Sequence, residues 1–197
     1  MPNDEWSREL AARLFAQRVV LLRGALDEVE ATRVSAELMT LDAEGDTAVT
    51  LRIDSAGGSL ALALTLMDVI ELLGVPVRAL CMGQVGGPAI GVLSVCAHRA
   101  AMPSTRFSLR EPATHTEAPA REVAQWARLR SDERQRFTDR VAAATRRPPA
   151  AVAEDFAAGA FMSATEALGY GLIDEVCRPQ AAIHQMPGPQ IGFRPRR

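Results

Sequence analysis

The chain has 197 residues, a mass of 21.2 kDa, a formal net charge of -2 at pH 7 and an isoelectric point of about 6.0. This length suits one domain that buries its own core. The charge argues against a protein that holds nucleic acid by neutralising phosphates. All 22 basic residues are arginine, which excludes mechanisms that use a lysine amine, such as Schiff bases and serine–lysine dyads.

The cysteines and the N-terminus indicate the compartment. Cys81, Cys96 and Cys177 are scattered among apolar residues, which favours buried reduced thiols over disulfides or a metal site. The first residues include acids where a signal peptide has a basic region, and no apolar run is long enough to cross a bilayer. We therefore expect a cytoplasmic protein with no metal, no cofactor and no membrane partner.

Hydrophobic periodicity and turn residues predict alternating helices and strands. In chain order these are a helix over 7–17, a strand over 18–24, a helix over 27–41, a strand over 48–53, a helix over 60–73, a strand over 74–83, a helix ending near His98, two short extended pieces within 99–109, a helix over 122–145, a helix over 150–158, a helix after a Ser163 cap and a closing strand. The recurring order of strand, glycine-rich turn and helix indicates an α/β fold.

The stretch GQVGGPAIGV, residues 83–92, stands where a strand passes into a helix. Glycine gives the backbone freedom at such a turn, and proline suits a first helical turn because its missing N–H has no intrahelical partner there. Turns of this kind commonly present a nucleophile or a phosphate-binding backbone. Here the residue at the apex, Gly87, has no side chain.

Four segments together resemble the proteolytic subunit of the ATP-dependent Clp serine protease. They are IDSAGGSLALALTLMDVI, VRALCMGQVGGPAIGVLSVCA, MPSTRFSLREP and FMSATEALGYGLIDEV. The resemblance runs in order over residues 7–178 and implies an α/β ClpP/crotonase-like fold of repeated strand-turn-helix units, with a projecting handle helix within 113–147. It leaves 1–6 as a short N-terminal segment and 179–197 as a flexible tail rich in proline and glycine. It also implies rings of seven subunits that stack in pairs through the handle.

Active members of that family carry a Ser-His-Asp triad, and the resemblance implies a position for each member. Gly87 stands at the serine position, Arg110 at the histidine position and Gly159 at the aspartate position. Glycine has no nucleophilic atom, arginine accepts no proton at neutral pH, and the second glycine has nothing with which to orient a base. The family's two oxyanion N–H groups fall at Gly58 and Pro88, and proline has no N–H. The resemblance thus implies a member without peptidase chemistry.

The resemblance also implies a rim pocket that docks the loops of a Clp-type ATPase. Its lining falls at Thr50, Arg52, Leu72, Leu80, Met82, Ala100 and Met102. Thr50, Arg52 and Ala100 remove aromatic surface, so we expect this docking to be weakened or altered. The family's pore-lining N-terminal segment and its ring-sensing Arg-Asp pair, which falls at Ala158-Gly159, are also expected to be missing, and the handle turn over 113–119 lacks the family's glycines.

The leading hypothesis is a catalytically inactive subunit with a structural or regulatory role in a ring, formed with itself or with active relatives. One alternative is a hydrolase with a rebuilt site, for which Ser94 and His98 form an i, i+4 pair on the predicted helix. Another is a crotonase-like acyl-CoA-binding protein that uses Glu111. Simpler interpretations cover the other polar or aromatic residues. We expect a helix cap at Ser59, turn chemistry at Asp54, a structural ion pair at Arg110-Glu111 and packing at Trp126. We also expect a loop histidine at His115, a tail residue at His184, and a solvated or inter-subunit face at Arg128, Arg130, Arg134 and Arg136.

Overall fold

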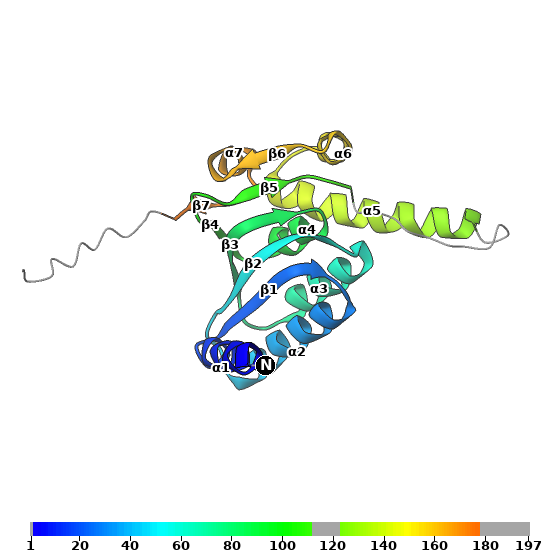
Figure 1. Cartoon of the computed structure of the whole chain (residues 1–197). Helices are drawn as coiled ribbons and strands as arrows, with labels where there is room; N and C mark the ends of the chain where they lie inside the picture. Colours follow the sequence, from blue (N-terminus) through cyan, green and yellow to red (C-terminus); the bar gives the residue numbers. More distant parts are fainter. Residues whose placement is uncertain (1, 112–122, 178–197) are drawn as a thin grey trace, which may run out of the picture.

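The computed structural model describes residues 2–111 and 123–177 (Figure 1). In chain order the elements are α1 (Pro2–Ala16), β1 (Val19–Leu26), α2 (Glu28–Glu44), β2 (Val49–Gly58), α3 (Leu60–Leu72), β3 (Val77–Gly86), α4 (Pro88–Ser94), β4 (His98–Ala101), β5 (Arg106–Ser108), α5 (Val123–Thr145), α6 (Pro149–Ala158), β6 (Phe161–Ser163), α7 (Ala164–Tyr170) and β7 (Glu175–Val176). This alternation confirms the predicted α/β fold.

One seven-stranded sheet forms the centre of the molecule, with the path β1-β2-β3-β4-β7 running parallel throughout. β5 pairs in parallel with the end of β3 and antiparallel with β6. Leu22, Leu51 and Ile53 are fully buried on one face of the sheet, whereas alternate residues such as Arg52 stay partly exposed. Helices α2, α3 and α4 cover the buried face, and α1 lies against β1 at the edge of the sheet (Figure 1).

Helix α5 projects from the body of the molecule, as the resemblance implies (Figure 1). Its second half packs inward through Phe137, Val141 and Ala142, which are buried. Gly91 of α4 allows this contact, because a Cβ there would lie 2.4 Å from a carbon of the Phe137 ring. Trp126, for which packing was expected, is only partly covered, because 41% of the residue is exposed on the projecting half.

Polar contacts tie the last elements to the sheet. Arg99 of β4 binds both carboxylate oxygens of Asp174 and also donates to the Gly171 carbonyl at 3.0 Å. The Arg99 hydrogen bonds hold the pKa of Asp174 below its ordinary value. Tyr170 donates its hydroxyl to Asp155 Oδ2 at 2.6 Å, and burial, followed by this hydrogen bond, raises the pKa of Tyr170. These contacts fix α7 and β7 against the rest of the domain.

Several predicted boundaries are wrong, for reasons that lie in tertiary pairing. The first helix begins at Pro2 rather than at residue 7, so it includes most of the segment expected to precede it. β2 and β3 continue to Gly58 and Gly86, because β1 and β5 pair with their ends. The helix expected to end near His98 stops at Ser94, and His98 instead begins β4 beside β3.

Two of the three free cysteines, Cys81 and Cys96, are buried. Burial raises the pKa of Cys81 well above its ordinary range and that of Cys96 to about 12, so both remain protonated and unreactive at neutral pH. Cys177 is only partly buried. Within the described ranges no group of three or more His, Cys, Asp or Glu side chains is placed to hold a metal ion. None of the described helices is both long and apolar enough to cross a membrane.

Candidate functional site

The turn between β3 and α4 is the centre of the candidate site. Gly87 has φ 51° and ψ -127°, a combination that favours glycine, and it immediately precedes Pro88 at the first turn of α4. Its N–H donates to the Ser108 carbonyl at 3.0 Å. A Cβ at Gly87 would lie 3.6 Å from the Arg110 carbonyl oxygen and 3.8 Å from Gly57 Cα, which are ordinary contact distances. The turn therefore has space for a side chain that the sequence does not provide.

Backbone contacts bring Gly87, Arg110 and Gly159, the positions that the resemblance assigns to a triad, near one another. Arg110 follows β5 and lies against the turn through its carbonyl group. The Leu109 N–H donates to the Ala160 carbonyl at 2.8 Å, which brings Gly159 next to the segment that carries Arg110. Gly159 ends α6 in the left-handed conformation, φ 69° and ψ 42°, where glycine is the most favourable cap. A Cβ there would meet no atom within 4 Å.

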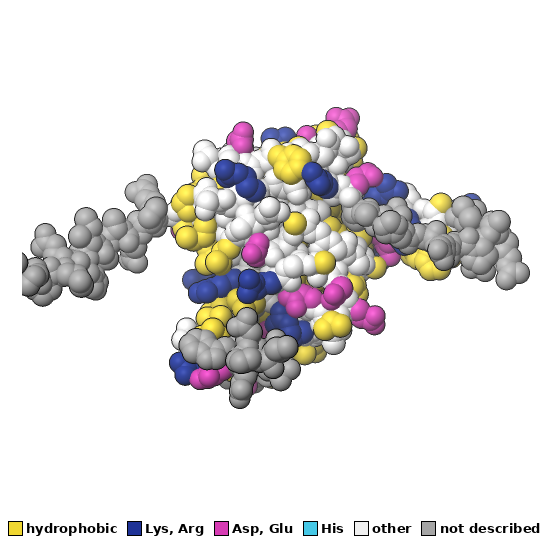
Figure 2. Space-filling view, in the orientation of Figure 1, with side chains coloured by type: hydrophobic (Ala, Val, Ile, Leu, Met, Phe, Trp, Pro, Cys, Tyr) yellow, Lys and Arg dark blue, Asp and Glu magenta, His cyan; other side chains and the backbone are white. Residues whose placement is uncertain are grey.

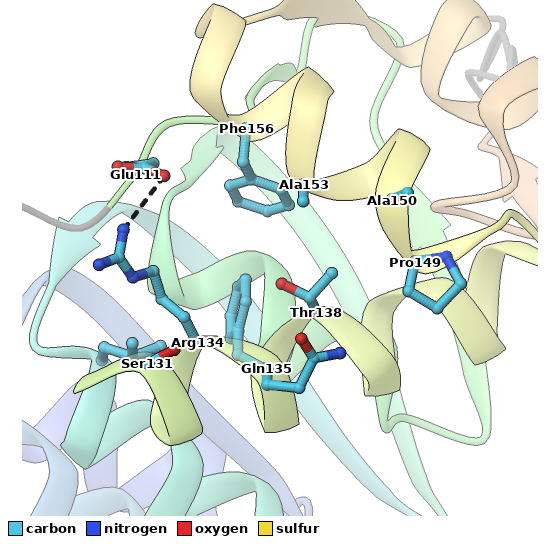
Figure 3. A pocket seen from close by; sticks show the side chains of 11 residues that line it. Glu111, Ser131, Arg134, Gln135, Thr138, Pro149, Ala150, Ala153 and Phe156 are labelled. Atoms are coloured by element: carbon cyan, nitrogen blue, oxygen red, sulfur yellow. Dashed lines mark hydrogen bonds and ion pairs between the residues drawn. The ribbon is translucent and has the colours of Figure 1, made fainter. Parts of the chain in front are cut away.

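The two charged side chains that follow β5 beside this turn contact other groups. The guanidinium carbon of Arg110 lies 4.6 Å from the centre of the Phe161 ring. Glu111 Oε1 lies 3.5 Å from Arg134 Nη1 of α5 (Figure 3). The predicted ion pair between Arg110 and Glu111 is wrong, because Glu111 pairs with Arg134 and Arg110 stacks on the Phe161 ring. Each side chain has a partner in the fold.

The resemblance assigns two oxyanion N–H groups to Gly58 and Pro88, and only Gly58 has a backbone N–H. Gly58 ends β2 with φ 141°, and a Cβ there would lie 2.5 Å from Leu26 backbone atoms, so only glycine fits. Pro88 is fully enclosed in the first turn of α4 and has no N–H. Position 88 therefore supplies no backbone N–H at this turn.

A cavity of about 470 Å³ lies beside Glu111, between α5 and α6 (Figure 3). The rings of Phe137 and Phe156 meet edge to face at 5.3 Å in its wall. The polar part of its lining comes from Glu111, Ser131, Arg134, Gln135 and Thr138. The lining residues that the structure describes include two hydroxyl groups but no histidine or cysteine, so neither hydroxyl has a neighbouring imidazole base there.

The serine–histidine pair proposed for a rebuilt site is wrong. Ser94 is the last residue of α4 and donates its hydroxyl to the Gly91 carbonyl at 2.7 Å. His98 belongs to β4, where its Nδ1 lies 3.8 Å from Asp174 and its Nε2 lies 3.5 Å from Glu175. Ser59 caps α3 through the Leu62 N–H, as predicted.

Most of the residues that the resemblance assigns to the rim pocket lie on the partly exposed face of the sheet. Strand register aligns Arg52 with Leu80 and Leu80 with Ala100. Thr50 and Met82 lie two residues away along the same strands, and Met102 follows β4. Leu72 differs, because it ends α3 outside this register and is 82% exposed.

Sequence reasoning missed the residues whose roles arise from distant contacts. Ser108, Arg134 and Phe161 contact the candidate site from β5, α5 and β6, and no local spacing indicates this. Asp54 also does more than shape its own turn, because its Oδ1 accepts the Gln84 N–H of β3 at 3.0 Å. The handle turn over 113–119, His115 and His184 lie outside the described residues.

A comparison with protein-family models gives a match to the family described as Clp protease, over residues 2–180. The matched region contains every element of the sheet, the strand-to-helix turn at Gly87 and the projecting helix α5. The chain belongs to the Clp protease family.

Proposed function

We propose that this chain is a catalytically inactive Clp-protease-type subunit with a structural or regulatory role. The observation that carries the proposal is the pair Gly87-Pro88 at the turn between β3 and α4. There, the backbone has space for a side chain, yet the sequence supplies neither a nucleophile nor the following N–H. Arg110 and Gly159, whose chain neighbours Leu109 and Ala160 are hydrogen-bonded, supply no base and no acid to orient one.

The role we propose is membership of a heptameric ring, or of two stacked rings, in the cytoplasm. Family membership supports ring formation. The projecting half of α5 supports contact with another subunit, because Trp126 and Leu129 expose 41% and 48% of their surface there. The partners are copies of this chain or active relatives. A Clp-type ATPase is a further partner only with altered docking, since Arg52 replaces aromatic surface at the rim.

Labelling with a fluorophosphonate and turnover of a fluorogenic peptide test the absence of catalysis. An active family member serves as the positive control in both assays. We expect neither a covalent adduct nor turnover above the rate of buffer alone. An adduct on Ser59, Ser94 or Ser108, identified by peptide mapping, would contradict the proposal.

Native mass spectrometry tests the assembly. The chain is measured alone and after co-expression with an active homologue, with Leu129→Asp as the variant and Arg128→Asp as an exposed control on the same helix. We expect ring-sized complexes that Leu129→Asp weakens and the control retains. A monomer under both conditions contradicts a ring role.

A further inference from the structure

A hollow of about 270 Å³ lies on the partly exposed face of the sheet next to α1. Leu14 of α1, Leu21 of β1 and Met82 of β3 form apolar walls, and Arg23 and Arg52 line it from β1 and β2. In Figure 2, dark-blue basic side chains lie on this side of the molecule near α1, with hydrophobic and magenta acidic side chains beside them. The hollow thus combines apolar contact area with guanidinium groups.

Strand pairing sets the position of the two arginines. Arg52 stands between Leu21 and Leu80 in the register, so apolar neighbours lie on both sides of it. Arg23 pairs with Asp54 in the register, one step further along the same face. Because in-register neighbours on parallel strands point to the same side, both guanidiniums belong to one surface.

Neither guanidinium is neutralised within the part of the chain that the structure describes. Arg52 Nε is buried and has no hydrogen-bond partner there, and the Arg23 and Arg52 side chains form no ion pair with a described carboxylate. Asp54 lines the hollow, but its Oδ1 accepts the Gln84 N–H. Glu30 accepts the Arg23 backbone N–H and is paired with Arg33. A buried donor without a partner is unfavourable. Arg52 as a whole is only partly buried, so an incoming acceptor would meet the remainder of its unneutralised guanidinium.

We propose that this hollow binds an acidic peptide segment of a partner protein. A carboxylate of the segment would pair with Arg52 and Arg23, and a neighbouring apolar side chain would pack against Leu14, Leu21 and Met82. Arginine forms two parallel hydrogen bonds to a carboxylate, which adds geometric selectivity to the charge. The resemblance implied apolar and aromatic docking at this face, so an arginine inside the hollow changes the chemistry of the partner.

Charge complementarity favours a foreign acidic segment over this chain's own tail. Residues 178–197 contain four arginines and no aspartate or glutamate, so they would bring like charge to the hollow. A second copy that presents the same face would also set arginine against arginine. A larger open hollow of about 850 Å³ shares Arg23 and Asp54 and continues to Gly57 and Gln84, which gives an extended peptide room beyond Arg23.

Fluorescence anisotropy with two labelled peptides tests the proposal on the full chain. The probes carry Leu-Glu-Leu and Leu-Gln-Leu between identical glycine and serine flanks. We expect the glutamate peptide to bind about tenfold more tightly than its glutamine twin, because only the former offers charge-assisted hydrogen bonds. Added salt should reduce this difference.

Arg52→Gln should abolish the preference for glutamate. Arg78→Gln, on the same face of the sheet but outside the lining, should keep it. Thermal melts establish that both variants are folded, and Arg52→Lys should give intermediate affinity. The proposal would be overturned by equal binding of the two peptides or by an unchanged glutamate preference in Arg52→Gln. It would also be overturned if an oligonucleotide bound more tightly than the glutamate peptide and Arg52→Gln abolished that binding. Self-association that depends on Arg52 and excludes the peptide would overturn it as well.

The peptide-binding proposal rests on the proposed function only in giving that subunit a partner of stated chemistry. It does not depend on Gly87. Fluorophosphonate labelling of Arg52→Gln separates the two questions. Loss of the glutamate preference in Arg52→Gln with no adduct supports both proposals, whereas an adduct together with that loss contradicts only the absence of catalysis.

Discussion

Introducing a Ser-His-Asp triad, and then a backbone N–H at position 88, tests whether these groups account for the proposed lack of catalysis. The first variant combines Gly87→Ser, Arg110→His and Gly159→Asp, and the second adds Pro88→Ala to return an N–H. The structure has room at position 87, where a Cβ would make contacts of 3.6 and 3.8 Å, and at position 159, where it would meet nothing within 4 Å. Both variants are therefore expected to be sterically acceptable.

The stability cost comes from the backbone rather than from packing. A serine held at φ 51° is expected to cost about 1–3 kcal/mol. An aspartate at φ 69° should cost less, because aspartate tolerates the left-handed region better than most residues. With about 2–4 °C lost per kcal/mol in a domain of this size, both variants should melt lower than the parent but remain folded at assay temperature.

The informative quantity is the ratio of turnover between the two variants. Loss of one oxyanion donor typically lowers turnover by about 10²–10³, or about 2.7–4 kcal/mol, so the variant with Pro88→Ala should exceed the triple variant by that factor. A fluorogenic peptide measures the ratio, and fluorophosphonate labelling at position 87 reports the nucleophile. Equal rates would refute the assignment of Pro88 to the oxyanion position. No reaction in either folded variant would refute the placement of the triad positions themselves.

Three further changes test the contacts that hold the domain together. Gly91→Ala forces a methyl group to within 2.4 Å of an aromatic ring of α5, so it should destabilise the fold by about 1–3 kcal/mol. Gly169→Ala, with nothing within 4 Å, should be neutral or stabilising, and equal melting temperatures for the two variants would contradict the packing. Asp174→Asn should lower the melting temperature at neutral pH, because Arg99 lowers the pKa of Asp174 in the folded state. An aspartate with a lowered folded-state pKa stabilises the fold above its unfolded pKa of about 3.9 and loses that effect as the pH falls through the folded pKa. The difference in melting temperature between Asp174→Asn and the parent should therefore disappear in acid. A difference that does not depend on pH would contradict this. Tyr170 is the one tyrosine of the chain, so phenolate absorbance reports it alone; its pKa should lie above the ordinary value in the folded protein and return to it in urea, and a normal folded-state pKa would count against the contact with its carboxylate partner.

Local signals predicted local structure well. The Ser59 and Ser163 caps are confirmed, because a hydroxyl that accepts an N–H a few residues later depends on neighbouring sequence only. The alternation of strands and helices is confirmed for the same reason. The position of His98 was wrong, because pairing with β3 draws the residue into a strand that no local periodicity indicates.

The candidate site was predictable in its backbone and not in its contacts. The glycine–proline turn follows from residue types that suit only such a turn, and the structure has it at Gly87-Pro88. The pairing of Glu111 with Arg134 and of Arg110 with Phe161 joins residues 23 and 51 positions apart in the chain. Such contacts depend on how helices and strands pack, so a sequence pattern does not reveal them.

The two halves of helix α5 differ in burial, so hydrogen exchange along this helix can report on assembly. Its second half is held by buried contacts, whereas Trp126 and Leu129 in its first half are 41% and 48% exposed. In an isolated subunit, amide hydrogens of the outer turns should exchange with solvent long before those around Phe137. A partner that covers the outer turns would slow that exchange, so the protection of one helix reports whether the subunit stands alone or is part of a larger particle.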